Sequence, residues 1–251
     1  MYKILANTLF LGKHIVFVPE CHSTNSLALE LCQQTSTSEG LVVITNQQTA
    51  GRGQRGSTWE AEPGMNLTFS VVLKPSFLSI KNQFLLNMFS SLAVHDYLSE
   101  KSDVPIYIKW PNDILINKLK ICGILIENQL SGERLTHTVV GIGLNINQQQ
   151  FTIATATSLR LITQKVYDLQ TELENLLAKV ESRYLQLRQN KDGKLREDYL
   201  SCMYRLNEHH PFMSNGKRFE GKILGVDDDG KLRILVGKNE RTFEVKEISF
   251  E

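Results

Sequence analysis

The sequence predicts an α+β protein in which helices pack on a mixed β-sheet and a small SH3-like β-barrel follows on the C-terminal side. Three observations predict this class. Short apolar runs of strand length recur between residues 41 and 146, two segments of helical periodicity lie between residues 168 and 203, and β-like runs broken by turn residues follow Arg205. We expect two domains, residues 1–205 and residues 206–251.

The first half of the larger domain alternates helix and strand patterns. Ser23 precedes a short stretch of helical periodicity, so a capped helix is expected to begin there. Residues 41–45 (LVVIT) have the composition of a buried strand, and residues 66–73 form a second strand after the glycine-rich segment 46–64. Residues 81–100 repeat apolar side chains at helical spacing, which predicts an amphipathic helix with a polar exposed face.

Three further strands and two helices are expected after that helix. The strands are residues 106–110, 121–127 and 137–146, and with the earlier pair they make a mixed sheet. A leucine stripe predicts a long helix over residues 168–190, and a second helix is expected over residues 193–203.

The C-terminal domain is expected to consist of short strands. Residues 222–226, 232–236 and 242–245 have strand composition, and turn residues separate them at 227–230 and 237–240. This spacing is typical of a small β-barrel or sandwich.

Composition and charge exclude several classes of protein. The chain has 251 residues, 41% of them hydrophobic and 22% charged, as in globular proteins, and its formal net charge of +1 gives no overall attraction to nucleic acid or to an acidic membrane. No signal peptide or membrane-length apolar run is visible, and the cysteines form no C-x-x-C pair. We expect a cytoplasmic protein with free thiols at Cys21, Cys32, Cys122 and Cys202.

Residues 51–56 (GRGQRG) satisfy the G-x-G-x-x-G pattern, but their context does not favour a dinucleotide-binding fold. That pattern must open a helix, whereas residues 57–64 include Pro63 and lead into a strand. No Walker loop is present, and no H-R-D or D-F-G indicates a kinase. The segment is either an ordinary solvated turn or a glycine loop whose Arg52 and Arg55 bind an anionic ligand.

Two later segments combine polar residues or glycines with strand patterns. Residues 109–113 (KWPND) end one expected strand and are followed by Lys118, Lys120 and Gly123. Taken alone, a lysine beside an aspartate there is a surface ion pair of little energetic weight. Residues 141–147 (GIGLNIN) place two glycines inside a strand, which indicates either a strained strand or the close approach of a ligand.

Together with Ser23-Thr24-Asn25, these segments resemble the biotin protein ligase family. The family pattern has S-T-N, Q-x-A-G-R-G-x-x-G, K-W-P-N-D, K-x-x-G-I-L and G-x-G-x-N in this order, and the sequence has them at residues 23–25, 48–56, 109–113, 120–125 and 141–146. Several ordered motifs are far more specific than any single one. The resemblance implies a class II synthetase-like catalytic domain over about residues 23–147, and the end of the sequence, with Lys246-Glu247-Ile248-Ser249, looks like the family's small C-terminal domain.

The resemblance implies which residues hold biotin. Biotin has a neutral ureido ring with two N–H donors and a carbonyl, so it requires neutral polar partners inside an apolar slot. By resemblance Ser23, Thr24 and Gln48 supply these hydrogen bonds, and the glycine strand forms the wall of the slot. The residues expected to bind biotin are Ser23, Thr24, Asn25, Gln48, Gly51, Arg52, Lys120, Gly123 and Ile124.

The resemblance also implies the residues for ATP and catalysis. Activation joins two anions, the biotin carboxylate and the α-phosphate of ATP, and cationic side chains offset their repulsion. The implied catalytic residues are Arg52, Lys120 and Asp113, of which Asp113 orients a lysine or assists Mg²⁺. Trp59 is expected to pack on adenine and Asn145 to pair with its amino edge. The expected ATP-binding residues are Arg52, Arg55, Trp59, Lys109, Asn112 and Asn145, and no metal ligands are assigned.

The implied activity is that of a biotin--[acetyl-CoA-carboxylase] ligase, which forms biotinyl-5′-AMP and transfers biotin to a lysine of a biotin carboxyl carrier domain. A lipoate or octanoate ligase or transferase of the same superfamily is the alternative, and either enzyme could be a monomer or a homodimer. A biotin-sensing repressor would need an N-terminal helix-turn-helix. Only about 22 residues precede Ser23, too few for that domain, so we expect no operator binding.

Some residues depart from the family pattern or carry weaker predictions. Many relatives have arginine where this sequence has Gln54, inside the glycine loop, and some have arginine in place of Ser57. Cys122 is expected to be a small buried side chain rather than a nucleophile. His209 and His210 lack metal-ligand companions and are expected to be linker residues.

Overall fold

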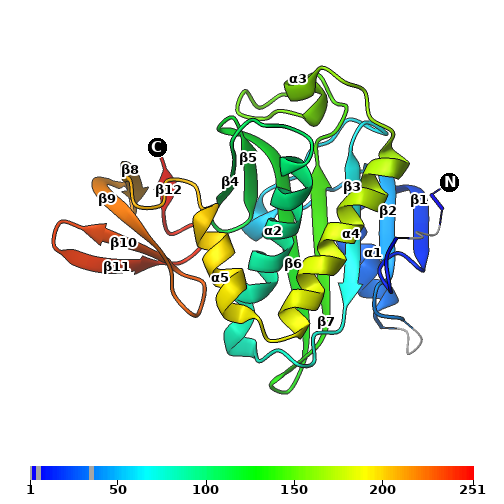
Figure 1. The fold of residues 1–251 in the computed structure, drawn as a ribbon, viewed down its shortest axis with the longest axis horizontal. Helices are drawn as coiled ribbons and strands as arrows, with labels where there is room; N and C mark the ends of the chain where they lie inside the picture. The colour runs from blue at the N-terminus through cyan, green and yellow to red at the C-terminus, as the bar shows by residue number, and fades with distance from the viewer. Residues whose placement is uncertain (1, 4–6, 34–36) are drawn as a thin grey trace.

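The computed structural model describes residues 2–3, 7–33 and 37–251, with the side chain of Arg55 excepted. Its larger sheet contains β1 (Ile15–Cys21), β2 (Val42–Gln48), β3 (Leu67–Leu73), β4 (Ile106–Lys109), β5 (Asp113–Ile116), β6 (Leu119–Ser131) and β7 (Arg134–Leu144). The strand order is β1-β2-β3-β7-β6-β5-β4 (Figure 1). Only the β1–β2 pair is parallel, so the sheet is mixed, and the α+β prediction is confirmed.

Two strands of this sheet were not predicted. β1 is an apolar run that contains Pro19, and proline is tolerated there because β1 is an edge strand. β5 has only four residues and begins at Asp113, the last residue of the KWPND segment. The five predicted strands all form, but β6 and β7 are longer than expected and pair along most of their length as a hairpin.

Helices cover both faces of the sheet. They are α1 (Thr24–Leu31), α2 (Phe84–Ser99), α3 (Leu159–Thr163), α4 (Leu169–Arg188) and α5 (Asp192–Ser201), of which only α3 was not expected. α1 packs on β2, β3 and β7, whereas α2 packs on β4, β5 and β6 and is itself covered by α4 and α5 (Figure 1).

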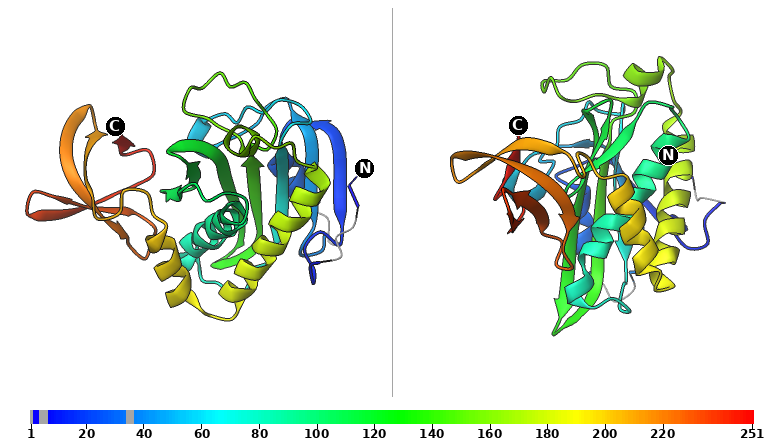
Figure 2. Two further views of the ribbon diagram at one scale, coloured as in Figure 1. Left: turned by 45° about the horizontal axis from the view of Figure 1, so that its top comes forward. Right: turned by 60° about the vertical axis from the view of Figure 1, so that its left-hand side comes forward.

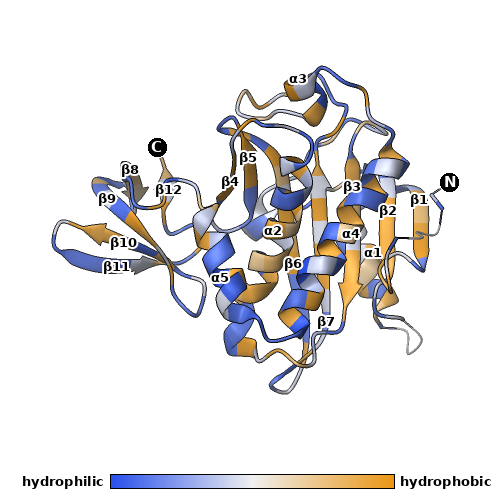
Figure 3. Ribbon diagram, in the orientation of Figure 1, coloured by the Kyte–Doolittle hydropathy of each residue, from blue (hydrophilic) through white to orange (hydrophobic). Residues whose placement is uncertain are grey.

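The prediction that α2 has a polar exposed face is wrong. Apolar side chains predominate along this helix (Figure 3), and even Ser90 and Ser91 are fully buried. The physical reason is the second layer, because α4 and α5 cover the side that faces away from the sheet.

Helix α4 fixes the segment that precedes β1. The carboxylate of Glu181, which is buried, accepts hydrogen bonds from the backbone N–H groups of Leu9, Phe10 and Leu11 at 2.6 to 2.9 Å. Three donors satisfy a buried charge that would otherwise destabilise the helix.

The C-terminal module is a five-stranded antiparallel sheet. It contains β8 (His209–Ser214), β9 (Lys217–Val226), β10 (Leu232–Val236), β11 (Asn239–Phe243) and β12 (Ser249–Phe250), in the order β11-β10-β9-β8-β12. The prediction of His209 and His210 as linker residues is wrong, because they open β8 and pair with β9. In the described ranges, no helix is long and apolar enough to cross a membrane.

The module lies beside the end of the large sheet that carries β4 (Figure 2). The indole N–H of Trp110 donates to the carbonyl of Gly230 at 2.8 Å, in the turn between β9 and β10. Gly230 has φ of +88°, and a Cβ there would lie 2.2 Å from the ring of Phe84. This turn therefore requires glycine, both for its backbone conformation and for its close packing against α2.

Candidate active site

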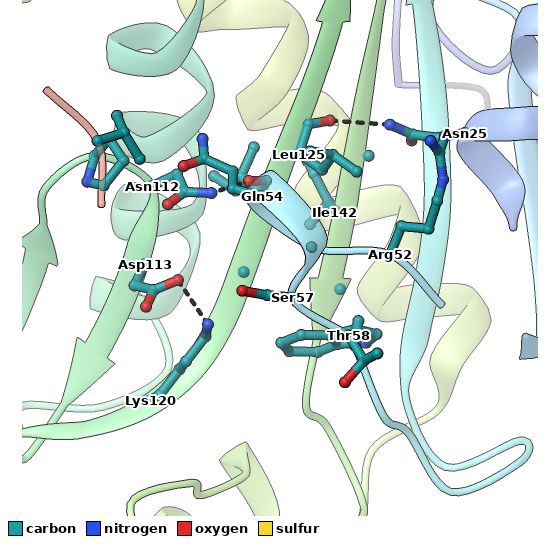
Figure 4. Close-up of a pocket in the computed structure, with 18 of the residues that line it drawn as sticks. Asn25, Arg52, Gln54, Ser57, Thr58, Asn112, Asp113, Lys120, Leu125 and Ile142 are labelled. Atoms are coloured by element: carbon teal, nitrogen blue, oxygen red, sulfur yellow. Dashed lines mark hydrogen bonds and ion pairs between the residues drawn. The ribbon is translucent and has the colours of Figure 1, made fainter. Parts of the chain in front are cut away.

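A cavity of about 500 Å³ lies where most of the expected site residues meet (Figure 4). Its walls come from the start of α1, the glycine loop, β3, β6, β7 and residues 109–113, and residues 245–250 of the C-terminal module complete it. The expected residues that line it are Ser23, Thr24, Asn25, Gln48, Arg52, Trp59, Lys109, Asn112, Asp113, Lys120, Gly123 and Ile124.

Two expected residues, Gly51 and Asn145, lie elsewhere, and the side chain of a third, Arg55, is not described. Gly51 does not line this cavity, and its Cα packs against Trp59, where a Cβ would come 2.2 Å from the Trp59 carbonyl oxygen. Asn145 lines a neighbouring cavity. The backbone of Arg55 belongs to the short 3₁₀ helix at Gln54–Gly56, but its side chain lies outside the described part of the chain.

One end of the cavity is neutral and polar. The start of α1 is nearly fully buried at Ser23, Thr24 and Asn25. Ser23 is the N-cap residue, but its hydroxyl makes no capping hydrogen bond, contrary to the prediction. The backbone N–H of Thr24 donates to Oε1 of Gln48 at 2.8 Å, and the Thr24 hydroxyl lies 3.2 Å from the same oxygen. These groups can exchange hydrogen bonds with an uncharged polar ring.

Two of the cations that line the cavity each contact a carboxylate. Nη2 of Arg52 lies 2.7 Å from Oε2 of Glu127, and Nζ of Lys120 lies 2.7 Å from Oδ1 of Asp113. Figure 4 shows the two cations on opposite sides of the glycine loop, with Asn25 beside Arg52. The arrangement can neutralise an anionic ligand that extends beneath the loop.

Lys109 adds a third cationic group to the lining. Burial lowers the pKa of its ammonium, the charge of Asp113 raises it, and the charge of Lys120 lowers it further, so that the pKa lies below its ordinary value. Its Nζ also lies 5.0 Å from the ring centroid of Phe250, in β12. Lys109 therefore links the cavity to the C-terminal module.

The floor of the cavity is a pair of facing glycines, Gly123 in β6 and Gly143 in β7. The Trp59 indole lies on them. A Cβ would come 3.1 Å from that ring at Gly123 and 2.3 Å from it at Gly143. Gly123 and Gly143 are therefore needed for the close approach of the Trp59 side chain rather than for a turn.

A second cavity, of about 680 Å³, adjoins the first and shares Thr58, Trp59 and Lys120 with it. Its lining includes Asn145 and Phe151. Nδ2 of Asn145 donates to the carbonyl of Thr157 at 3.0 Å, while its Oδ1 is buried and has no hydrogen-bond partner among the described residues. The Nε1–H group of Trp59 is likewise buried and unpaired there. A ligand with matching polar groups would satisfy both.

The sequence interpretation missed two polar residues of the site, Ser70 in β3 and Glu127 in β6. Neither lines the cavity, but each lies on the same face of its strand as a residue that does, since Thr68 precedes Ser70 and Leu125 precedes Glu127 by two positions. Strand periodicity could therefore have found them. The contribution of residues 245–250 had no comparable signal, because it depends on how the module packs.

Fold and site together define an α+β domain whose cavity is suited to an anionic small molecule, extended by a small antiparallel β module. A model of the biotin/lipoate A/B protein ligase family matches residues 18–145. The chain is 30% identical over 229 residues to the bifunctional ligase/repressor BirA of Bacillus subtilis, a match that covers 89% of the chain and 70% of that protein.

Other relatives give the same result. The biotin--[acetyl-CoA-carboxylase] ligase of Mycobacterium tuberculosis is 29% identical over 225 residues, which cover 88% of the chain and 82% of that protein. The biotin protein ligase of Aquifex aeolicus, solved in complex with biotin and ATP, superimposes with a TM-score of 0.78 at 27% identity, over 95% of the chain and 99% of the solved one. The chain belongs to the biotin/lipoate A/B protein ligase family.

Proposed function

We propose that the chain is an ATP-dependent biotin protein ligase. The observation that carries this function is the meeting of Arg52, Lys120 and the neutral pair Thr24 and Gln48 around one cavity. The relatives from Mycobacterium tuberculosis and Aquifex aeolicus are named for biotin and not for lipoate. The neutral polar groups suit a ureido ring better than a dithiolane.

In this proposal biotin lies in the first cavity. Its ureido ring faces Ser23, Thr24 and Gln48, and its carboxylate extends toward Arg52 and Lys120. Leaving one buried hydrogen-bonding group unpaired costs about 1–3 kcal/mol, which gives these residues their selectivity.

ATP lies across the shared wall of the two cavities. The unpaired Oδ1 of Asn145 is a suitable acceptor for the adenine amino group, and Trp59 offers an aromatic surface beside it. Lys120 lines both cavities and is thus suited to the point where the α-phosphate meets the biotin carboxylate.

The first step is in-line attack of the biotin carboxylate on the α-phosphorus of ATP. A carboxylate oxygen–phosphorus bond forms, the bond between the α-phosphorus and the α,β-bridging oxygen breaks, and pyrophosphate leaves. Arg52 and Lys120 offset the charge that gathers between the two anions, and this is the main contribution the protein makes to the rate. Asp113 holds Lys120 in position through their ion pair.

Mg²⁺ is proposed to arrive as part of the nucleotide substrate. No group of three or more His, Cys, Asp and Glu side chains suited to a metal ion occurs in the described ranges. Mg²⁺ is commonly held by one or two carboxylates together with substrate phosphates, so Asp113 is the side chain of this cavity that could contact it.

In the second step a lysine amine of a biotin carboxyl carrier domain attacks the acyl carbon of biotinyl-5′-AMP. An amide bond forms, AMP leaves, and the amine loses a proton; Lys120 stabilises the oxyanion that develops. We assign this chemistry to the cytoplasm, where ATP is available and the four free cysteines would stay reduced.

The test is ATP–pyrophosphate exchange with biotin or lipoate, followed by the mass of a carrier domain incubated with protein, Mg-ATP and biotin. We expect exchange with biotin and a carrier heavier by one biotinyl group. Exchange supported by lipoate and not by biotin would overturn the assignment.

A further inference from the structure

Glu127 contacts two residues that line the first cavity, Arg52 and Asn25. Its Oε2 accepts from Nη2 of Arg52 at 2.7 Å and from Nδ2 of Asn25 at 2.8 Å. The side chain is 25% exposed and comes from β6, at a position to which neither the sequence motifs nor the reaction gives a role. Glu127 thus links Arg52 of the glycine loop to Asn25 at the start of α1.

The contact with Glu127 fixes the orientation of the Asn25 amide. Nδ2 of Asn25 donates both to Glu127 and, at 3.2 Å, to the carbonyl of Leu125 (Figure 4). An ionised carboxylate and a carbonyl can only accept. Rotating the amide by half a turn would set Oδ1 against both, so the amide oxygen must face the other way.

The oxygen of Asn25 faces Ser70, whose hydroxyl is fully buried in β3. Oγ of Ser70 lies 2.6 Å from Oδ1 of Asn25 and 2.7 Å from Oγ1 of Thr24. A hydroxyl has one hydrogen. Because Oδ1 of Asn25 can only accept, Ser70 donates to it and is left as an acceptor toward Thr24.

The same reasoning decides what Thr24 can offer to a ligand. Both partners of its hydroxyl are acceptors, since Oε1 of Gln48 lies 3.2 Å away and Oγ of Ser70 has its hydrogen committed to Asn25. The hydrogen of Thr24 therefore stays within the protein, and a lone pair on Oγ1 remains for the cavity. A lone pair there selects a ligand with an N–H donor.

We propose that Glu127 is a positioning residue that sets the donor direction of the Asn25–Ser70–Thr24 relay, so that the cavity presents an acceptor to the ligand. Arg52 balances the charge of Glu127. This inference deepens the proposed function and rests on it, because the ligand N–H belongs to the ureido ring of biotin. A lipoate dithiolane has no such donor.

The experiment measures biotin affinity by calorimetry, without ATP, for the parent, Glu127→Gln, Ser70→Ala and the double variant. Glu127→Gln keeps the shape but lets the new amide donate to Asn25, which frees the relay to reverse. We expect each single variant to bind biotin about ten-fold or more weakly. The relay makes the two positions dependent, so the double variant should bind no more weakly than the weaker single variant.

A matched control is Glu133→Gln, which removes the same charge from the exposed turn between β6 and β7. It should bind biotin as the parent does, and thermal unfolding should show that all five proteins are folded. Parent-like affinity in Glu127→Gln, or losses that multiply in the double variant, would refute the relay. If the parent itself bound no biotin, the proposed function would fail first.

Discussion

Arg52 and Lys120 each lie against one carboxylate, and both pairs are partly exposed. The side chains are 43% and 37% exposed in the two cations, and 25% and 27% exposed in their partners Glu127 and Asp113. Ion pairs of this kind contribute about 0–1 kcal/mol, so an incoming anion can share or replace the carboxylate at little cost. The same pairs keep the two cations oriented toward the cavity.

The first residue-scale prediction concerns Lys120→Ala. We expect pyrophosphate exchange to fall by about 10²–10³-fold, because the ammonium acts where the two reacting anions meet. Biotin affinity without ATP should change only a few-fold, since the hydrogen bonds of the ureido ring remain. Lys165→Ala, in an exposed loop, is the control. Equal exchange rates for Lys120→Ala and the parent would contradict the role.

A second residue-scale prediction concerns a thiol outside the site. Sγ of Cys202 lies 3.9 Å from Nδ1 of His95. Burial raises the pKa of the thiol, but the hydrogen bond and charge of His95 outweigh it, so the net pKa is lowered. Burial lowers the pKa of His95, while Asp96 and Cys202 raise it to about 9. At neutral pH the imidazole is therefore charged and favours the thiolate.

Replacing His95 with glutamine should shift the alkylation of Cys202 to higher pH. Without the imidazolium, burial and the charge of Asp96 still raise the pKa of the thiol, and only the hydrogen bond of Ser201 lowers it. Burial is the largest of these influences, so less thiolate forms at a given pH. The rate of iodoacetamide modification of Cys202, followed by mass spectrometry from pH 6 to 9, measures this. Cys21 is the internal control and should keep its rate. An unchanged Cys202 profile would count against the pair.

At the scale of elements, the sequence predicted what periodicity can report. Five strands of the large sheet and the helices α1, α2, α4 and α5 were found, because each has an apolar pattern of adequate length. β5 was missed because its first residue, Asp113, was assigned to the KWPND turn, which left only three apolar residues. The predicted polar face of α2 was wrong because the covering by α4 and α5 is tertiary information. In the candidate site, the residues of the motifs were predicted. Ser70 and Glu127 belong to no motif and were missed, although strand periodicity places them next to the site.

The element-scale prediction concerns the facing glycines of β6 and β7. In Gly143→Ala the new Cβ would lie 2.3 Å from Cε2 of Trp59, so the indole must move. We expect the KM for ATP to rise about ten-fold and the tryptophan fluorescence to change. Gly193→Ala, where a Cβ meets nothing within 4 Å, is the matched control. A parent-like KM and spectrum for Gly143→Ala would show that the indole position has no bearing on the nucleotide.

At the scale of the whole molecule, the boundary predicted near residue 205 remains a prediction, and the contacts that cross it are extensive. Residues 245–250 line the first cavity, Phe250 lies over Lys109, and Trp110 donates to Gly230. Side chains of both modules also belong to one hydrophobic cluster. The C-terminal module therefore acts as part of the active-site wall.

The whole-molecule prediction is that Trp110→Phe weakens this docking. The substitution keeps the aromatic packing but removes the donor to the Gly230 carbonyl. A buried hydrogen bond of this kind contributes about 1–3 kcal/mol when its partner is left unsatisfied. Urea unfolding should give a lower midpoint, and exchange activity should fall. Tyr204→Phe is the control, because it removes a hydroxyl that has no hydrogen-bond partner among the described residues. Identical losses in both variants would exclude a specific role for the indole.

The participation of residues 245–250 in the cavity has a consequence for biosynthesis. A ribosome releases the binding motifs at residues 23–147 long before it makes β12, so a nascent chain carries every motif and still lacks one wall of the pocket. Premature termination between residues 148 and 244 would yield a polypeptide with the recognisable motifs and an incomplete pocket. A nascent chain would then gain enzymatic activity only after β12 had been synthesised.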